Sequence, residues 1–225
     1  MSVTRPGTRA VAAVCLALLA TLAAAVGSPA AVAQGYPAKP IRMLVPFTPG
    51  GGTDILARIV AGEMSKSMNQ QVIVDNRPGG NTLVATEVVV RAAPDGYTVI
   101  MQTNNFSANP TLYAGKIGFD SLKDLAPVSL VAGNPHVLVV NPNVPAKDLR
   151  EYIALAKSKP GAITFASAGS GTVNHLSGEL LKMLAGIDLT HVPYKGSGSV
   201  MPDLLGGQVA SLFAAMPTVT GHIRE

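Results

Sequence analysis

Residues 41–54 read IRMLVPFTPGGGTD, and this stretch decides the expected fold. A continuous apolar run of strand length ends at Pro46, three consecutive glycines follow, and an amphipathic helix is expected to begin at Ile55. A strand, a glycine turn and a helix in this order present backbone N–H groups at the helix N-terminus, where α/β proteins bind anions. Glycine allows positive φ and lets a ligand approach without meeting a Cβ. The stretch therefore predicts an anion-binding turn.

The same alternation continues along the chain. The helix after Asp54 has apolar residues at four-residue spacing, strands are expected at 71–74 and 97–102, and a helix is expected between them up to about residue 93. Asn81 is the candidate N-cap of that helix. This β-α-β-α-β order predicts a parallel sheet with right-handed crossovers. The polar run 103–110 is expected to be irregular.

A second α/β unit is predicted after two apolar runs that have no helix between them, at 127–132 and 136–141. Its expected elements are helices at 146–158, 173–185 and 200–205 and strands at 163–166, 189–192 and 208–214. A second glycine-rich turn, SAGSGT at 167–172, again joins a strand to a helix. The expected organisation is a first lobe at 34–132 and a second lobe at 133–225.

The first 33 residues are predicted to be a secretory signal peptide. Arg5 and Arg9 precede an apolar stretch at 10–26, and the small-residue pattern at 31–33 predicts cleavage after Ala33. A transmembrane anchor is the alternative, but the apolar run is short and ends in small residues. The expected location of the mature protein is the periplasm.

The single cysteine, Cys15, lies inside the predicted signal peptide. The mature chain would thus have no disulfide, thiolate metal site or thiol nucleophile. Removing Arg5 and Arg9 lowers the formal net charge from +4 to +2. Such a small charge, with no basic run, argues against nucleic-acid or membrane-surface binding.

Nucleotide and metal sites are disfavoured by spacing. A dinucleotide fingerprint needs a glycine three residues after Gly52, where Ile55 stands, and no P-loop lysine follows. His175 and Glu179 share a helix face but supply only two metal ligands. No cofactor and no metal are expected.

Hydrolysis is the remaining catalytic alternative. The sequence has no G-x-S-x-G elbow, because Ala168 stands two residues before Ser170 and Lys195 two before Ser197. Ser170 and His175 are close in sequence, so an exported hydrolase using this pair stays open. No catalytic residue is assigned.

Two glycine turns, one in each half, favour binding of an acid between two lobes. Each turn brings a helix N-terminus, which carries about half a positive charge. Hydroxyl donors accompany both turns: Thr48, Thr53, Ser167, Ser170 and Thr172. Asp54 would repel an anion, so its expected role is to cap the helix and hold the turn in shape.

Several longer motifs identify the family that the chain resembles. They include YPAKPIR at 36–42, PFTPGGGTD at 46–54, NRPG at 76–79, APDGYT at 93–98, PVSL at 127–130, GSGT at 169–172, HVPYKG at 191–196 and DLLGGQ at 203–208. In this order they strongly resemble the Bug-type receptors, the periplasmic substrate-binding proteins of tripartite tricarboxylate transporters.

The resemblance implies a type II periplasmic-binding-protein fold, a two-lobed Venus flytrap that closes on a small carboxylate and delivers it to membrane permease subunits. It implies a monomer and loop backbone amides as ligand donors. Carried onto this sequence, the ligand-binding residues are Phe47, Pro49, Gly50, Gly51, Gly52, Thr53, Asp54, Asn81, Thr103, Asn104, Ser167, Ala168, Gly169, Ser170, Gly171 and Thr172. A solute sensor of the same fold, signalling to a membrane protein, is the alternative.

Two departures from the family pattern matter. Phe213 is followed by Ala214 and Ala215, where members that bind amino acids often have Asp-Asn. The expected ligand therefore lacks an ammonium group and is a di- or tricarboxylate or an aromatic acid. Family chains also continue for about a hundred residues beyond 225, so the first lobe is expected to be incomplete, with an open sheet edge.

Overall fold

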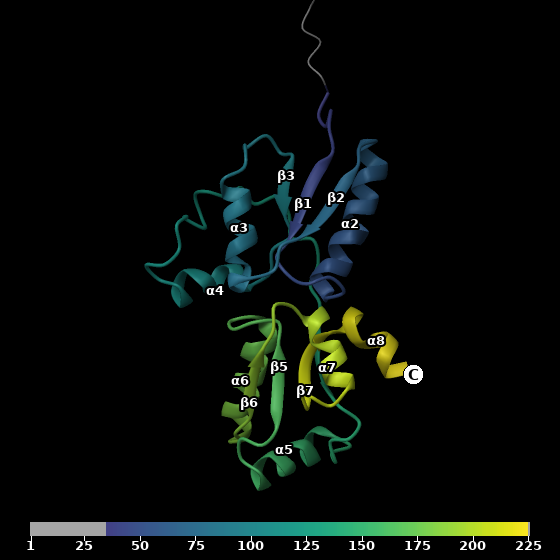
Figure 1. The fold of residues 1–225 in the computed structure, drawn as a ribbon, viewed down its shortest axis with the longest axis vertical. Coiled ribbons are helices and arrows are strands. Elements are labelled where there is room, and N and C mark those ends of the chain that lie inside the picture. Colours follow the sequence, from purple (N-terminus) through teal and green to yellow (C-terminus); the bar gives the residue numbers. More distant parts are fainter. Residues whose placement is uncertain (1–34, 225) are drawn as a thin grey trace, which may run out of the picture. The chain divides into compact units, whose positions relative to one another are not determined.

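The computed structural model describes residues 35–224 (Figure 1). The predicted signal peptide at 1–33 lies outside these residues. Helices and strands alternate through most of the chain, and the strands form two separate sheets. None of the helices within 35–224 combines the length and apolar composition that crossing a bilayer requires.

The first sheet is parallel, in the order β2-β1-β3. Its elements are β1 (Ile41–Val45), α2 (Gly52–Met68), β2 (Val72–Asn76), η1 (Gly80–Thr82), α3 (Leu83–Val90) and β3 (Thr98–Ile100). Figure 1 shows α2 on one side of this sheet and α3 on the other. The predicted β-α-β-α-β unit is therefore confirmed.

Helix α2 packs closely on the first sheet because its inner face carries small residues. Ala57 and Ala61 are buried against Ile41, Met43 and Val45 of β1. This burial of apolar surface fixes the carboxyl end of β1, from which the turn at 46–51 leaves.

The connection between the sheets differs from the prediction. The run 103–110, expected to be irregular, forms most of the helix α4 (Asn105–Leu112). Its sequence, NFSANPTL, has poor intrinsic helix propensity, so tertiary contacts decide its conformation. The apolar run 127–132 has no regular structure, and Val128 and Leu130 are 91% and 92% exposed.

The second sheet has the order β4-β7-β5-β6. Its elements are β4 (His136–Val140), α5 (Leu149–Ser158), β5 (Thr164–Ser167), α6 (Val173–Ala185), β6 (Thr190–Pro193), η2 (Ser197–Ser199), α7 (Met201–Leu205), β7 (Ser211–Ala215) and α8 (Met216–Arg224). Strand β5 pairs in parallel with both β6 and β7, whereas β4 runs antiparallel to β7.

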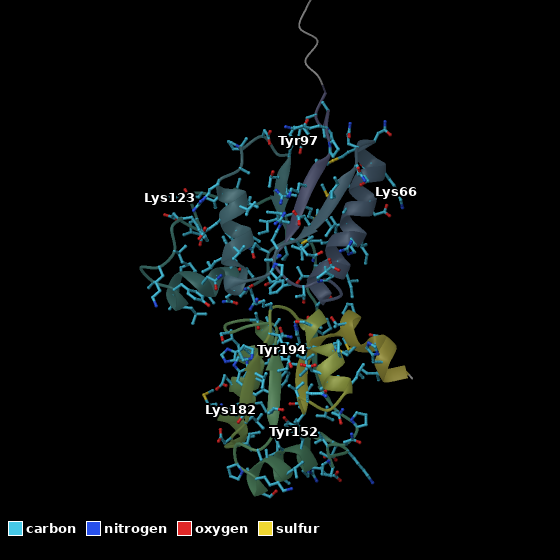
Figure 2. All side chains as sticks on the ribbon, viewed as in Figure 1. Lys66, Tyr97, Lys123, Tyr152, Lys182 and Tyr194 are labelled. Atoms are coloured by element: carbon cyan, nitrogen blue, oxygen red, sulfur yellow. The ribbon has the colours of Figure 1, made fainter. Side chains whose placement is uncertain are left out.

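The core of the second sheet is built around Phe165, which is fully buried. Gly178 of α6 makes room for its ring, because a Cβ there would stand 2.2 Å from Phe165 Cε2. Tyr152 of α5, labelled in Figure 2, is also buried, and its hydroxyl hydrogen-bonds Ser211 Oγ at 2.8 Å. Asp148 caps α5 by accepting the Glu151 N–H at 2.8 Å.

Candidate functional site

A cavity of about 120 Å³ lies where the turns after β1, β2, β5 and β6 meet. In α/β proteins, ligands bind beyond the carboxyl ends of parallel strands. The lining residues are Pro46, Phe47, Gly79, Gly80, Asn81, Thr82, Tyr113, Ala168, Gly169, Ser170, Tyr194 and Lys195. Lys195 is the charged residue of this lining, which contains no carboxylate. The surroundings are therefore suited to an anion.

A larger hollow of about 440 Å³ runs along β1 and β2. It is lined by strand residues, among them Arg42 and Asp75, whose side chains form an ion pair. This pair neutralises the local charge, and the hollow has no glycine turn in its lining. We assign the candidate site to the smaller cavity.

Asp54 holds the first glycine turn. Its carboxylate is 3% exposed and accepts hydrogen bonds from Gly50 N at 2.9 Å, Asn76 Nδ2 at 2.9 Å and Arg58 Nε at 3.0 Å. Burial alone would raise the pKa of Asp54, but these hydrogen bonds outweigh it and lower the pKa. The residue does not cap α2, whose N-cap is Gly51. The predicted helix-capping role of Asp54 is therefore wrong, because its carboxylate accepts the N–H of Gly50, which precedes the N-cap residue.

The first turn packs directly on residues that follow β6. Thr48 N donates to Lys195 O at 3.2 Å. A Cβ on Gly198 would stand 2.0 Å from Pro49 O, and one on Gly196, whose φ is +148°, would stand 2.4 Å from Thr48 Oγ1. Only glycine fits at these positions, so the two segments form one wall beside the cavity.

The second glycine turn satisfies most of its own amides. Gly169 N donates to Ser167 Oγ at 3.1 Å, Gly171 N donates to His175 Nδ1 at 3.1 Å, and Thr172 N donates to Gly169 O at 3.2 Å. Ser170 is exposed at the tip of the turn and lines the cavity. Within this turn, Ser170 is thus the residue best placed to meet a ligand.

Two stacked histidines support the second turn. The rings of His175 and His191 lie 4.1 Å apart, and Phe165 stacks on His191 at 4.9 Å. His191 Nε2 lies 2.6 Å from Ser167 Oγ. Ser167 Oγ also accepts the Gly169 N–H at 3.1 Å, so this hydroxyl links the His191 ring to the backbone of the turn.

The same contacts argue against the hydrolase alternative. The Nδ1 atom of His175 accepts the Gly171 N–H, and its Nε2 atom faces Glu179 Oε1 at 3.8 Å. A general base must reach its nucleophile, but both nitrogens of His175 face groups other than Ser170. Glu179 also pairs with Lys182 at 3.2 Å. Within 35–224 no group of three metal-ligating residues occurs.

Stability should fall as the two histidines gain protons. Burial lowers the pKa of both rings, and for His191 burial together with the charge of His175 lowers the pKa to about 4. The unfolded chain, with a histidine pKa of about 6.5, binds protons first. The neutral histidines therefore make their full contribution to the free energy of unfolding above about pH 6.5. This contribution is lost as the pH falls toward 4, and the loss for His191 is about 3 kcal/mol at most.

Urea unfolding between pH 4 and 7 measures this dependence. The His191→Gln variant should show a shallower decline, because glutamine does not titrate. His222→Gln changes an exposed histidine on α8 and should keep the parent slope. If the free energy of unfolding falls equally steeply with decreasing pH in all three proteins, His191 is not the source of the pH dependence.

The turn at 79–82 has an unusual backbone. Four consecutive residues have positive φ, and two of them, Asn81 at +52° and Thr82 at +76°, are not glycine. A left-handed conformation costs an L-residue about 1–2 kcal/mol, and it is especially rare for a β-branched side chain. The predicted N-cap role of Asn81 is wrong, because the Asn81 side chain bonds to Asn109 on α4, at 2.7 Å.

The structure brings together only part of the predicted site. Phe47, Asn81, Ala168, Gly169 and Ser170 line the cavity. The other predicted residues of the two turns are not part of the lining: Pro49, Gly50, Gly51, Gly52, Thr53, Asp54, Ser167, Gly171 and Thr172. Thr103 and Asn104 are absent from the lining, and the Thr103 hydroxyl bonds Asn105 instead.

Sequence reasoning missed seven lining residues: Pro46, Gly79, Gly80, Thr82, Tyr113, Tyr194 and Lys195. All except Tyr113 follow the carboxyl ends of β1, β2 or β6, so the strand-end rule could have found them. Tyr194, labelled in Figure 2, donates its hydroxyl proton to Asp203 at 2.6 Å. Burial and this carboxylate raise its pKa to about 12, so the phenol stays neutral.

Comparisons with known proteins identify the family of the chain. Residues 56–225 match the tripartite tricarboxylate transporter family receptor, TctC. BugT of Bordetella pertussis is 40% identical over 216 residues, covering 93% of this chain and 65% of that protein. A Cupriavidus necator protein encoded in the gbd 5′ region is 40% identical over 198 residues, covering 86% and 60%.

Solved structures show the same fold. A protein of R. palustris with adipate superimposes with a TM-score of 0.81 at 33% identity, and the periplasmic binding protein BugD with 0.79 at 34%, each over 84% of this chain and 63% of that one. MatC from Rhodopseudomonas palustris with bound malate gives 0.76 at 31%, over 84% and 64%. The chain thus spans about 60–65% of the length of these relatives. It has the two-lobed α/β fold of periplasmic binding proteins and belongs to the family of tripartite tricarboxylate transporter receptors, as a Bug-type member.

Proposed function

We propose that the chain is a periplasmic solute-binding receptor. It captures a small carboxylate in the cavity between the two sheets and delivers it to the permease subunits of a tripartite tricarboxylate transporter. One observation carries the proposal: turns from both sheets converge on a lining with amide and hydroxyl groups and a lysine but no acidic side chain. The adipate and malate bound by two relatives support the ligand class.

The proposed ligand has no ammonium group. An ammonium ion needs a carboxylate or several carbonyl partners when it leaves water. Ala214 and Ala215, at the end of β7, are buried, and the Ala215 Cβ packs against Gly52. They leave no acidic partner at this position, so we favour a di- or tricarboxylate or an aromatic acid.

The receptor is proposed to act without catalysis. Asp54, the buried carboxylate of the first turn, is occupied by Gly50, Asn76 and Arg58. His175 is occupied by Gly171. These groups hold backbone in place, which suits binding rather than proton transfer to a substrate.

A thermal-shift screen with paired acids tests the proposal. Glutarate against glutamate, and succinate against aspartate, differ by one ammonium group, and adipate, malate and benzoate extend the panel. An acid at a hundred times its Kd should stabilise the protein by about 2.7 kcal/mol, which raises Tm by roughly 5–10 °C at this size.

Within each pair the acid without the ammonium group should give the larger shift, and calorimetry should then yield its Kd. Tighter binding of glutamate or aspartate would contradict the proposed ligand class. Absence of binding by every acid would contradict the receptor function itself.

A further inference from the structure

Helix α4 carries a buried polar network that the function above does not use. Asn105 and Asn109 are 0% and 3% exposed, and both point their carboxamides at the turn 79–82. Asn109 Nδ2 donates to Asn81 O at 2.8 Å and to Thr82 Oγ1 at 3.2 Å. Asn105 Nδ2 lies 3.4 Å from Thr82 Oγ1. The network thus forms hydrogen bonds to Asn81 and Thr82, the two non-glycine residues of the turn that have positive φ.

Its bonds compensate for an unfavourable backbone. Residues in sparsely populated φ/ψ regions persist only where their surroundings impose the conformation. Asn109 Nδ2 donates a hydrogen bond to the carbonyl oxygen of Asn81, and Thr86 Oγ1 donates one to the carbonyl oxygen of Thr82 at 2.9 Å. With both carbonyls bonded, the left-handed turn is held from the side of α4 and from the side of α3.

The result is a defined orientation of the Asn81 side chain. One proton of Asn81 Nδ2 goes to Asn109 Oδ1 at 2.7 Å, which leaves the second proton for another partner. A Cβ on Gly169 would stand 3.4 Å from Asn81 Oδ1, and one on Gly171 would stand 3.5 Å from Asn81 Nδ2. Asn81 therefore lies directly against the second glycine turn.

We propose that Asn105 and Asn109 are positioning residues of the acid site: they hold the 79–82 turn in its left-handed conformation and thereby set the Asn81 carboxamide against the turn at 169–171. The expected effect on acid binding rests on the proposed function. The expected effect on the conformation of the two turns does not, because the contact between Asn81 and the second turn lies within the protein itself.

The first experiment needs no ligand. Amide resonances of Gly169, Ser170 and Gly171 are recorded by NMR in the parent protein and in the Asn109→Ala variant. These resonances should shift, although residue 109 lies on another element, because Asn81 loses its orientation. Ser107→Ala, an exposed change on the same helix, should leave them unmoved.

A rescue separates positioning from a general weakening of α4. Glycine adopts positive φ without strain, so Thr82→Gly in the Asn109→Ala background should move the three resonances back toward their parent positions. Asn109→Asp, which keeps an acceptor for Asn81 Nδ2 but loses the donor to Asn81 O, should give an intermediate shift. If the Asn109→Ala variant does not fold, the same three resonances are compared between the parent protein and the Asn105→Ala and Asn109→Asp variants.

The second experiment measures affinity for the acid that binds most tightly in the screen, with adipate as the first probe. Asn109→Ala should weaken binding about 10- to 100-fold, since two or three side-chain hydrogen bonds are lost, and Thr82→Gly should recover most of the loss. Unmoved resonances in every Asn109 variant, or affinity unchanged by them, would overturn the proposal. Shifts and rescue in a protein that binds no acid would leave the positioning intact and refute the receptor function.

Discussion

The Gly198→Ala substitution is expected to weaken acid binding by about 10- to 100-fold. The new methyl group would stand 2.0 Å from Pro49 O and 3.0 Å from Gly51 N. Both are backbone atoms, which cannot rotate away, so the segments 47–51 and 195–198 must separate. Overpacking of this kind costs about 1–3 kcal/mol, and each 1.4 kcal/mol is tenfold in Kd. Phe47 and Lys195, which line the cavity, would move with these segments.

Calorimetric titration of the parent and variant proteins with the same acid measures the loss. Gly62→Ala is the matched control, because that glycine lies on α2 with nothing within 4 Å of the added Cβ. It should leave Kd unchanged and stabilise the helix by about 0.5–1 kcal/mol. Equal affinities for the Gly198→Ala variant and its parent would show that this contact is not part of the acid-binding conformation.

Asp54→Ala is expected to lower the free energy of unfolding by about 2–4 kcal/mol and to remove acid binding. The change deletes the acceptor for Gly50 N, Asn76 Nδ2 and Arg58. A single hydrogen bond to a charged group contributes about 1.5–3 kcal/mol. Arg58 is 54% exposed, so it returns to water and the loss stays at the lower end for a buried pair.

Urea unfolding at pH 7 checks this value, with Glu63→Ala as the control on the same helix. Glu63 pairs with Lys66 at 2.7 Å, but both side chains are more than 70% exposed, so its loss should change stability by about 0.5 kcal/mol or less. The free energy of unfolding of Asp54→Asn should lie between those of Asp54→Ala and Glu63→Ala, because asparagine retains one acceptor oxygen. A stable Asp54→Ala protein with parent affinity would mean that the first turn needs no internal support.

The sequence was sufficient where local pattern and tertiary structure agree. Apolar runs that end in glycine turns predicted β1 and β5, because burial on both faces requires continuous apolar strands. Helix α2 begins at Gly52, three residues before the predicted start at Ile55. Helix α6 matches its predicted bounds, 173–185. The two glycine turns do meet near one cavity, and Phe47, Asn81 and Gly169 are in its lining.

The sequence was insufficient where distant contacts decide local structure. Helix α4 forms from a sequence of low helix propensity because Asn105 and Asn109 bond to a turn more than 20 residues earlier. The left-handed Asn81 and Thr82 depend on those same bonds, so no local rule could predict them. The antiparallel direction of β4 was not predicted either, since the paired residues of its partner β7 lie 71–79 positions further along the chain.

The position of β7 also bears on when this protein can fold. Strand β7 is the last strand described, yet it stands inside the second sheet, between β4 and β5. A growing chain cannot join these two strands until residues 211–215 have been synthesised, which at about 5–20 residues per second is several seconds after β4. Until then β4 has no neighbour in this sheet. Such late closure keeps the nascent chain open for longer, which suits a protein proposed to cross a membrane before it folds.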